Sequence, residues 1–250
     1  MITISFLIAS AMGATEPLIH APLASDEFGS IAGKITWEGE RPAPTPDLEL
    51  KEEATKGCKH GPEGLDKRDE SLLIDAQGGV ANVVLTIEVA GAERKIPAEP
   101  IVFDQHGCRF VPHVAVVPIG ATVRFANNDD TNHNIHTYAK KNAAFNTNVA
   151  PAGTLDKVKD KAEVIDVKCD IHPWMKGYVV VTEATHWAVS AADGSFAIAG
   201  LPAGEYELSW WHEELGKGKT AKVKVEAGQK ATLAHMVSAE KKASGGARRR

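Results

Sequence analysis

Short runs of alternating apolar and polar residues recur along the chain, each with the length of a β-strand. VIDVK (residues 164–168) alternates strictly, and YVVVT (residues 178–182) is a β-branched run. Similar runs lie at residues 28–44, 78–88, 188–213, 221–228 and 231–237, and Asp193-Gly194 is a dipeptide that favours a hairpin turn. No segment has the period of a long helix. The pattern predicts an all-β fold made of paired sandwiches.

Composition narrows the class of protein without changing the predicted fold. The chain has 250 residues, of which 43% are hydrophobic and 24% charged, enough for one large or two small globular domains. Its formal net charge is −5, whereas a nucleic-acid binder needs a basic face to meet phosphates. We therefore expect no nucleic-acid partner. The arginines that end the chain, within residues 241–250, are interpreted as a disordered, solvated basic tail.

The first residues have the shape of a secretory signal peptide. An apolar core of about ten residues is followed by small residues, including Ala9-Ser10-Ala11, although the usual basic residues are missing. A first buried strand is the alternative. We favour a signal peptide over residues 1–14 and a periplasmic or extracellular location. No other segment approaches the roughly 18 apolar residues of a membrane helix, so no integral membrane span is expected.

The stretch CDIHPWM, Cys169 to Met175, places a thiol, an imidazole and a thioether within one short segment. Each of these residues alone is more often an ordinary core or surface residue. Together they lie between two predicted strands, at 164–168 and 178–182. A loop that leaves one strand and returns as the next can direct all three side chains to one point. A thiolate, two imidazoles and a weak axial Met make a blue-copper site, so one more imidazole is needed.

The missing imidazole is found about 30 residues upstream. There a predicted strand, Val123 to Ala126, leads into an Asn/Asp-rich loop that carries His133 and His136. Over residues 99–183, about a third of the chain, the sequence now resembles the cupredoxins. The shared features are the His133-Asn134 pair and a C-x2-H-P-[FW]-M ligand loop, followed by a basic residue, Gly and a Val-rich strand.

The cupredoxin resemblance implies a fold, a ligand set and a cofactor. The fold is a Greek-key β-sandwich over residues 98–183, and the cofactor is copper in one type 1 site. The implied ligands are His133, Cys169, His172 and Met175, with His136 as the fallback for the first histidine. Asn134 would brace the ligand loop.

Three cysteines in an exported protein leave one unpaired. If Cys169 is a copper thiolate, Cys58 and Cys108 remain as candidates for one disulfide, which an oxidising compartment permits. Two separate buried thiols are the alternative. A zinc-like cluster of this pair with His60 and His106 is also conceivable, but it lacks the tight ligand spacing of structural zinc sites.

The pattern D-G-x-F-x-I-x-x-L-P-x-G-x-Y-x-L, here Asp193 to Leu208, resembles the carboxypeptidase-regulatory-like, or transthyretin-like, sandwich. The first half of that sandwich is found far upstream. We therefore predict a discontinuous sandwich over residues 28–97 and 184–240, with the cupredoxin inserted between them. A plain tandem of domains is the alternative. The two arrangements differ in whether the strand Ile31 to Trp37 pairs with strands beyond Thr185.

Aromatic residues in this late block allow two interpretations. Tyr206, Trp210 and Trp211 could form a sugar-stacking face. Because Tyr206, Leu208 and Trp210 lie two residues apart along a strand, we expect them to share one face and fill the core.

These observations predict an exported electron carrier rather than an enzyme. The chain has no G-x-S-x-G, H-E-x-x-H or G-x-G-x-x-G motif. A carrier would exchange electrons with a redox protein such as a cytochrome or an oxidoreductase. The alternative function is a non-redox copper-binding or glycan-binding module built on a cupredoxin scaffold.

Overall fold

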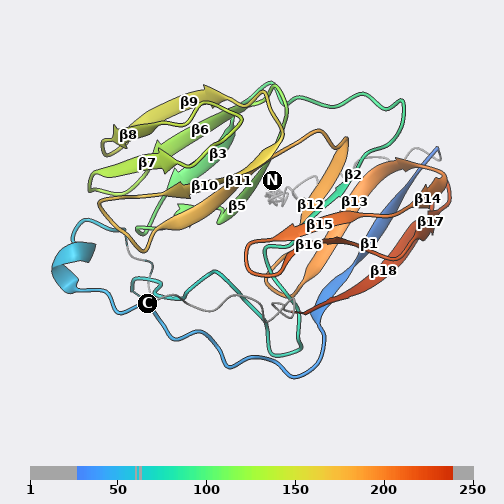
Figure 1. Ribbon diagram of the computed structural model, residues 1–250, viewed down its shortest axis with the longest axis horizontal. Helices are drawn as coiled ribbons and strands as arrows, with labels where there is room; N and C mark the ends of the chain where they lie inside the picture. Colours follow the sequence, from blue (N-terminus) through green and yellow to red (C-terminus); the bar gives the residue numbers. More distant parts are fainter. Residues whose placement is uncertain (1–26, 60, 62–63, 239–250) are drawn as a thin grey trace, which may run out of the picture.

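Two β-sandwiches lie side by side in the computed structural model (Figure 1). The structure describes residues 27–59, 61 and 64–238, so the predicted signal peptide and basic tail lie outside the described residues. The only helix in this part of the chain is a short 3-10 helix, η1, at Glu52–Thr55. Within the described residues, no helix is long and apolar enough to cross a membrane. The predicted all-β class is confirmed.

The central sandwich is formed by two sheets from residues 101–182. The strand orders are β5-β11-β10-β7-β8 and β4-β3-β6-β9. The bounds are β3 Ile101–Gln105, β4 Phe110–Val111, β5 Val114–Pro118, β6 Thr122–Asn127, β7 His133–Thr137, β8 Asn146–Val149, β9 Thr154–Val158, β10 Glu163–Lys168 and β11 Lys176–Thr182. Side chains on alternate strand positions face inward, and Phe103, Phe125 and Val179 are fully buried between the sheets.

The outer sandwich combines strands from both ends of the chain. Its sheets have the orders β13-β1-β18 and β12-β2-β15-β16, and β14 and β17 form a ribbon beside them. The bounds are β1 Phe28–Trp37, β2 Val84–Ile87, β12 His186–Val189, β13 Ser195–Pro202, β14 Gly204–Tyr206, β15 Ser209–His212, β16 Gly216–Lys219, β17 Val223–Val225 and β18 Lys230–Val237. Ile35, Leu85 and Phe196 lie in its core.

Strand β1 pairs along its length with two late strands, as the discontinuous arrangement requires. It runs antiparallel to β13, with Ile31 opposite Ile198, and parallel to β18, with Gly33 opposite Leu233. The expected pairing of the Ile31 to Trp37 strand beyond Thr185 is therefore confirmed. The exact limits of the two predicted domains stay a prediction.

The two sandwiches share a buried interface. In β11, Val179 and Val181 point into the central core, whereas Tyr178 and Val180 point the other way. On the facing sheet, Val84 of β2 joins Tyr178 and Val180 in a separate apolar cluster, and Trp187, Val189 and Trp211 pack against it. The sheet that ends in the ligand loop is thus covered on both faces.

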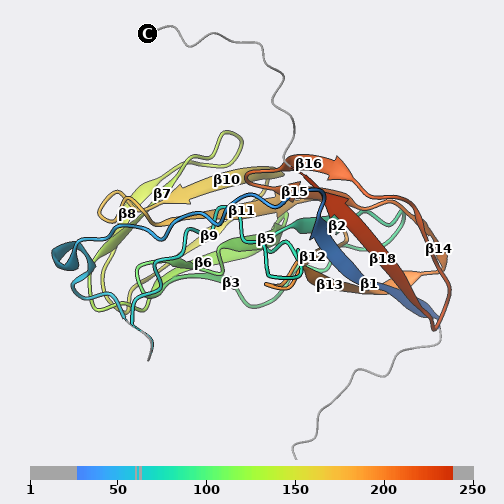
Figure 2. The same ribbon diagram turned by 90° about the horizontal axis from the view of Figure 1, so that it is seen from below.

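A long connection crosses from one sandwich to the far end of the other. Residues 38–59, here called the strap, leave β1 and run along the molecule to η1, which lies beside the central sandwich (Figure 2). Apart from η1 the strap has no helix or strand. The sequence pattern predicted a strand over residues 78–88, but only Val84–Ile87 is regular.

Candidate metal centre

The segment Cys169 to Met175 forms a tight loop between β10 and β11, as predicted. These strands are antiparallel, and the last pair before the loop is Lys168 with Lys176. Within the loop, Cys169 N donates to Met175 O at 3.3 Å and Met175 N donates to His172 O at 2.9 Å. The two bonds turn the chain back on itself, so that the cysteine and the methionine lie at the same end of the sandwich core.

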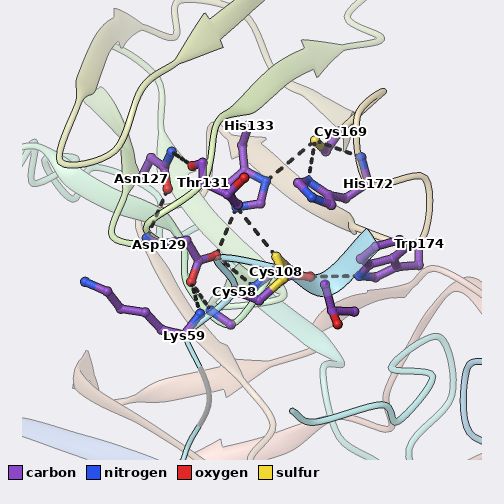
Figure 3. The surroundings of a disulfide bond; sticks show 12 residues. Cys58, Lys59, Cys108, Asn127, Asp129, Thr131, His133, Cys169, His172 and Trp174 are labelled. Carbon is purple, nitrogen blue, oxygen red and sulfur yellow. Dashed lines mark hydrogen bonds and ion pairs between the residues drawn. A yellow bond between two sulfur atoms is a disulfide. The ribbon is translucent and has the colours of Figure 1, made fainter. Parts of the chain in front are cut away.

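His133 lies on strand β7, not in the loop that the sequence analysis expected. Alternation along β7 buries His133, Ile135 and Thr137 on the inner face. This position aims the His133 ring at the ligand loop (Figure 3). The Asn/Asp-rich composition upstream suggested a loop because the pairing with β8, from Asn146 to Val149, is not visible in the local sequence.

Three donor atoms converge at the end of the core. Cys169 Sγ lies 3.8 Å from His133 Nδ1 and 3.7 Å from His172 Nδ1, and the two imidazole centroids are 4.5 Å apart. All three residues are buried, with His172 the most exposed at 4%. The structure thus brings together the thiol and both imidazoles that the sequence singled out.

The spacing of these atoms suits a shared metal ion. With bonds of about 2.3 Å to sulfur and about 2.0 Å to nitrogen, as for zinc, a trigonal ion separates the two donor atoms by about 3.7 Å. The observed separations match that value. Each imidazole offers Nδ1 to the same point, and burial removes competing water. The three residues therefore fit a metal ion held by one thiolate and two imidazoles.

Met175 and Asn134 also lie where the resemblance implies. Met175 is 1% exposed and belongs to the same buried cluster as Cys169. Asn134 Oδ1 accepts hydrogen bonds from Asp170 N at 2.7 Å and from the Cys169 thiol at 3.3 Å. Asn134 therefore ties strand β7 to the ligand loop, which is the bracing contact expected for it.

His136, the fallback ligand, lies apart from this cluster. It occupies the outer face of β7, where its ring stacks on Tyr138 with centroids 4.3 Å apart. Its Nδ1 is 3.0 Å from Asp170 Oδ1 on the surface. Since it lies three residues after His133 on a strand, it faces the opposite side of the sheet.

A buried carboxylate that no sequence motif indicates lies on the other side of His133. Asp129 Oδ2 lies 2.9 Å from His133 Nε2, and both side chains are fully buried (Figure 3). Asp129 also accepts backbone hydrogen bonds from Lys59, Gly107 and Cys108, each at 2.8 Å. One carboxylate thus joins the histidine, the strap and the loop before β4. Its only sequence signal is a place in an Asn/Asp-rich segment.

These contacts shift the ionisation of the site. Burial raises the pKa of the Cys169 thiol, but hydrogen bonds with His133 and His172 outweigh burial and lower the pKa to about 6. Burial lowers the pKa of His133, whereas its contacts with Asp129 and Cys169 raise it, and the net direction is upward. The pKa of Asp129 is lowered by His133 and three backbone donors in spite of its burial. The thiolate form that metal binding needs is therefore favoured.

The predicted disulfide between Cys58 and Cys108 is present, and Cys169 is the free cysteine of the described residues. Because the pair is oxidised, the zinc-like cluster with His60 and His106 is not formed; His106 is exposed, and His60 lies outside the described residues. The disulfide lies close to the donors that surround Cys169. Cys108 Sγ is 3.9 Å from His133 Nε2, so the bridge lies directly beside the candidate metal centre.

The aromatic residues of the outer sandwich are occupied by packing. Tyr206 and Trp210 lie against the outer core that contains Leu208, as the alternation predicted. Trp211 faces the other way and meets Tyr178 of β11, with ring centroids 5.1 Å apart. A sugar-stacking face formed by these three residues therefore finds no support.

Comparisons with known proteins gave partial matches. The family described as polysaccharide lyase family 4, domain II, matches residues 163–233, which extend from β10 into the outer sandwich. No curated protein matches the chain. The carboxypeptidase-regulatory-like resemblance of residues 193–208 stays a prediction.

Several solved structures are similar to part of the chain. The copper-containing nitrite reductase NirK from Thermus scotoductus SA-01 is 26% identical, with a TM-score of 0.33, over 39% of this chain and 25% of that one. This chain thus spans a quarter of that enzyme's length. A mutant of amicyanin in its Cu(I) form is 25% identical, with a TM-score of 0.32, over 39% and 98%. A purple cupredoxin from Nitrosopumilus maritimus is 22% identical, with a TM-score of 0.29, over 33% and 99%.

Proposed function

We propose that this protein is an exported blue-copper electron-transfer protein with one type 1 copper ion. The proposed ligands are His133, Cys169, His172 and Met175. One observation carries the proposal. Cys169 Sγ lies 3.8 Å from Nδ1 of His133 and 3.7 Å from Nδ1 of His172, and the buried Met175 lies beside them. A thiolate, two imidazoles and a weak axial thioether are the donor set of such sites.

Bound copper would supply a one-electron Cu(II)/Cu(I) couple, and the chain's own residues would keep the donors in place through both states. The backbone N–H of His172 donates to Cys169 Sγ at 3.4 Å, and Asn134 holds the loop from the other side. His133 is fixed at Nε2 by Asp129. Ligands held by such outer contacts move little when the charge at the metal changes.

The setting of the site supports an exported carrier rather than an enzyme. A disulfide persists in an oxidising compartment such as the periplasm or the cell exterior. All three converging donors are buried, which keeps the proposed metal ion away from bulk solvent and suits exchange of an electron through the protein. The proposed partner is another redox protein, such as a cytochrome or an oxidoreductase.

The test is a visible absorption spectrum of the purified protein after addition of Cu(II). We expect an intense blue colour that ascorbate bleaches and that air or ferricyanide restores. Cys169→Ala should abolish the colour, because only the thiolate gives the strong charge-transfer band. Met175→Leu should stay coloured but shift to a higher reduction potential, because the weak axial donor stabilises Cu(II) more than Cu(I). A Cys169→Ala variant that stays blue would refute the ligand assignment.

The alternative function uses the same fold but predicts a different result. A non-redox copper-binding module would bind the ion without reversible bleaching and without electron exchange. Stopped-flow mixing of the Cu(I) form with an oxidised cytochrome c measures that exchange directly. Absence of bleaching in a protein that holds copper stoichiometrically would favour the alternative.

A further inference from the structure

The Cys58–Cys108 disulfide lies beside the imidazoles of the candidate metal centre. The sulfur atoms of Cys58 and Cys108 and a ring nitrogen of His172 all lie within 4.8 Å of one another. Cys108 Sγ is also 3.9 Å from Nε2 of His133 (Figure 3). The bridge thus places two additional sulfurs next to the imidazoles of the metal centre.

We propose that Cys58 and Cys108, once reduced, form with His172 a second site for Cu(I), which shares this histidine with the first site but does not need Cys169. Thiolates are soft donors that select Cu(I), and an imidazole completes a three-donor set. The state of the disulfide would then decide what the protein does with copper. With the bridge closed, a single thiolate serves the metal centre. With the bridge open, three thiolates surround the same buried end of the sandwich.

Both cysteines are held in place by bonds that do not depend on the disulfide. Asp129 accepts hydrogen bonds from the backbone of Cys108 at 2.8 Å and of Lys59, next to Cys58, at 2.8 Å. Asp130 N donates to Gly57 O at 3.0 Å. Opening the bridge therefore leaves the two sulfurs close together and still facing His172, which keeps the entropic cost of forming the site small.

The chemistry balances with a dithiol as the reductant. The dithiol supplies two electrons and two protons, the bond between Cys58 Sγ and Cys108 Sγ breaks, and the dithiol becomes a disulfide. When Cu(I) binds, the two cysteine thiols release their protons to solvent. No electron passes to or from the copper ion in these steps.

A cavity borders the candidate site on the side of Cys108. It has a volume of about 370 Å³, lies against Cys108, Trp174 and Met175, and is otherwise lined mostly by charged residues. Trp174 Nε1 donates to Cys108 O at 3.1 Å, so the indole marks the boundary between the cavity and the disulfide. Cys58 is 8% exposed, whereas Cys108 is fully buried, so a reductant would attack the bridge at Cys58.

The test uses the Cys169→Ser chain, which lacks the thiolate of the first site. One sample keeps the disulfide, and the other is reduced with dithiothreitol and desalted under nitrogen. Competition with the chelator bicinchoninate measures Cu(I) binding in both. We expect the reduced sample to bind one Cu(I) ion per chain, ~100-fold or more tighter than the oxidised sample. A ratio below ~10-fold would overturn the proposal.

A matched control removes one of the two sulfurs. The Cys58→Ser, Cys169→Ser chain should bind Cu(I) as weakly as the oxidised sample, and tryptophan fluorescence checks that it remains folded. X-ray absorption of reduced, Cu(I)-loaded Cys169→Ser gives an independent measurement. Two sulfur neighbours at copper are expected, and a spectrum with only nitrogen or oxygen neighbours would refute the site. The blue colour of the oxidised wild type is measured separately, so failure of this proposal leaves the proposed function standing.

Discussion

Asp129 is the residue whose removal should affect both stability and copper binding. Its carboxylate is buried and accepts four hydrogen bonds, three from backbone N–H groups and one from His133 Nε2. Replacement by Asn keeps the shape but turns one oxygen into an NH2 group. The amide nitrogen then faces two groups that donate to Asp129 Oδ2 in the wild type, the Cys108 N–H and Nε2 of His133.

The expected loss follows from counting these bonds. One buried backbone donor loses its acceptor, at a cost of about 1–3 kcal/mol, and the bonds that remain change from charged to neutral, at about 1 kcal/mol each. Asp129→Asn should therefore lower the free energy of unfolding by about 3–5 kcal/mol. Domains are stable by only about 5–15 kcal/mol, so the variant should stay folded but close to the limit.

Copper affinity should fall for a separate reason. An amide that donates to His133 Nε2 moves the ring proton to Nδ1, the atom that faces Cys169. That tautomer cannot bind a metal ion at Nδ1, and loss of such outer contacts typically weakens metal binding about 10- to 100-fold. Urea unfolding of the copper-free protein and chelator competition for Cu(II) measure the two effects.

The neighbouring Asp130 provides the control. Its side chain is 75% exposed and forms an ion pair at 3.4 Å with Lys59 Nζ. Because exposed pairs contribute about 0–1 kcal/mol, Asp130→Asn should unfold at nearly the same urea concentration as the wild type. The reasoning fails if the two variants unfold alike, or if Asp129→Asn binds copper as tightly as the wild type.

Three further predictions test other parts of the structure. His133→Gly should lose the blue spectrum whereas His136→Gly should retain it, and the reverse result would mean that the first ligand lies three residues later. Contacts with Glu213 and Glu70 outweigh burial and raise the pKa of His113 from 6.5 to about 9. The stabilisation that His113 provides should thus be complete below pH 6.5 and lost as the pH rises through 9. The unfolding free energy of the wild type should fall over this range, whereas that of His113→Gln should depend less on pH. An equal pH dependence in both proteins would contradict the assignment. A Cβ at Gly33 would lie 1.6 Å from Leu233 O of the neighbouring strand. Gly33→Ala should therefore lower the free energy of unfolding by about 3 kcal/mol, and with it the melting temperature. A melting curve like that of the wild type would refute the β1–β18 pairing.

The ligand loop could be predicted from the sequence because its chemistry is local. The donors of Cys169 to Met175 lie in one short loop between two predicted strands, so spacing alone places them together. The thiol-to-imidazole contact within the loop needs no information from elsewhere. The contact with His133 needed the family resemblance, since 36 residues separate it from Cys169.

The remaining parts of the site depend on long-range contacts that no local pattern records. Cys58 and Cys108 are separated by 50 residues, and counting cysteines gave their pairing but not its position beside His133. Asp129 becomes important only because the strap returns to the central sandwich. The sequence does carry one signal of the contact between the sandwiches. The apolar run Tyr178 to Val181 is buried on both faces, as a continuous apolar strand often is, and it indicates the interface between the sandwiches.

The outer sandwich is connected to the metal centre through the strand that follows the ligand loop. Lys176 begins β11 directly after Met175, and its Nζ lies 2.7 Å from Glu213 Oε2 of the outer sandwich. Tyr178 OH donates to the same carboxylate at 2.9 Å. The Glu213 side chain is only 2% exposed, so moving the two sandwiches apart would expose an apolar surface and break the ion pair between this carboxylate and the partly exposed Lys176. The ligand loop is therefore fixed by β10 on one side and by the packing of both sandwiches on the other.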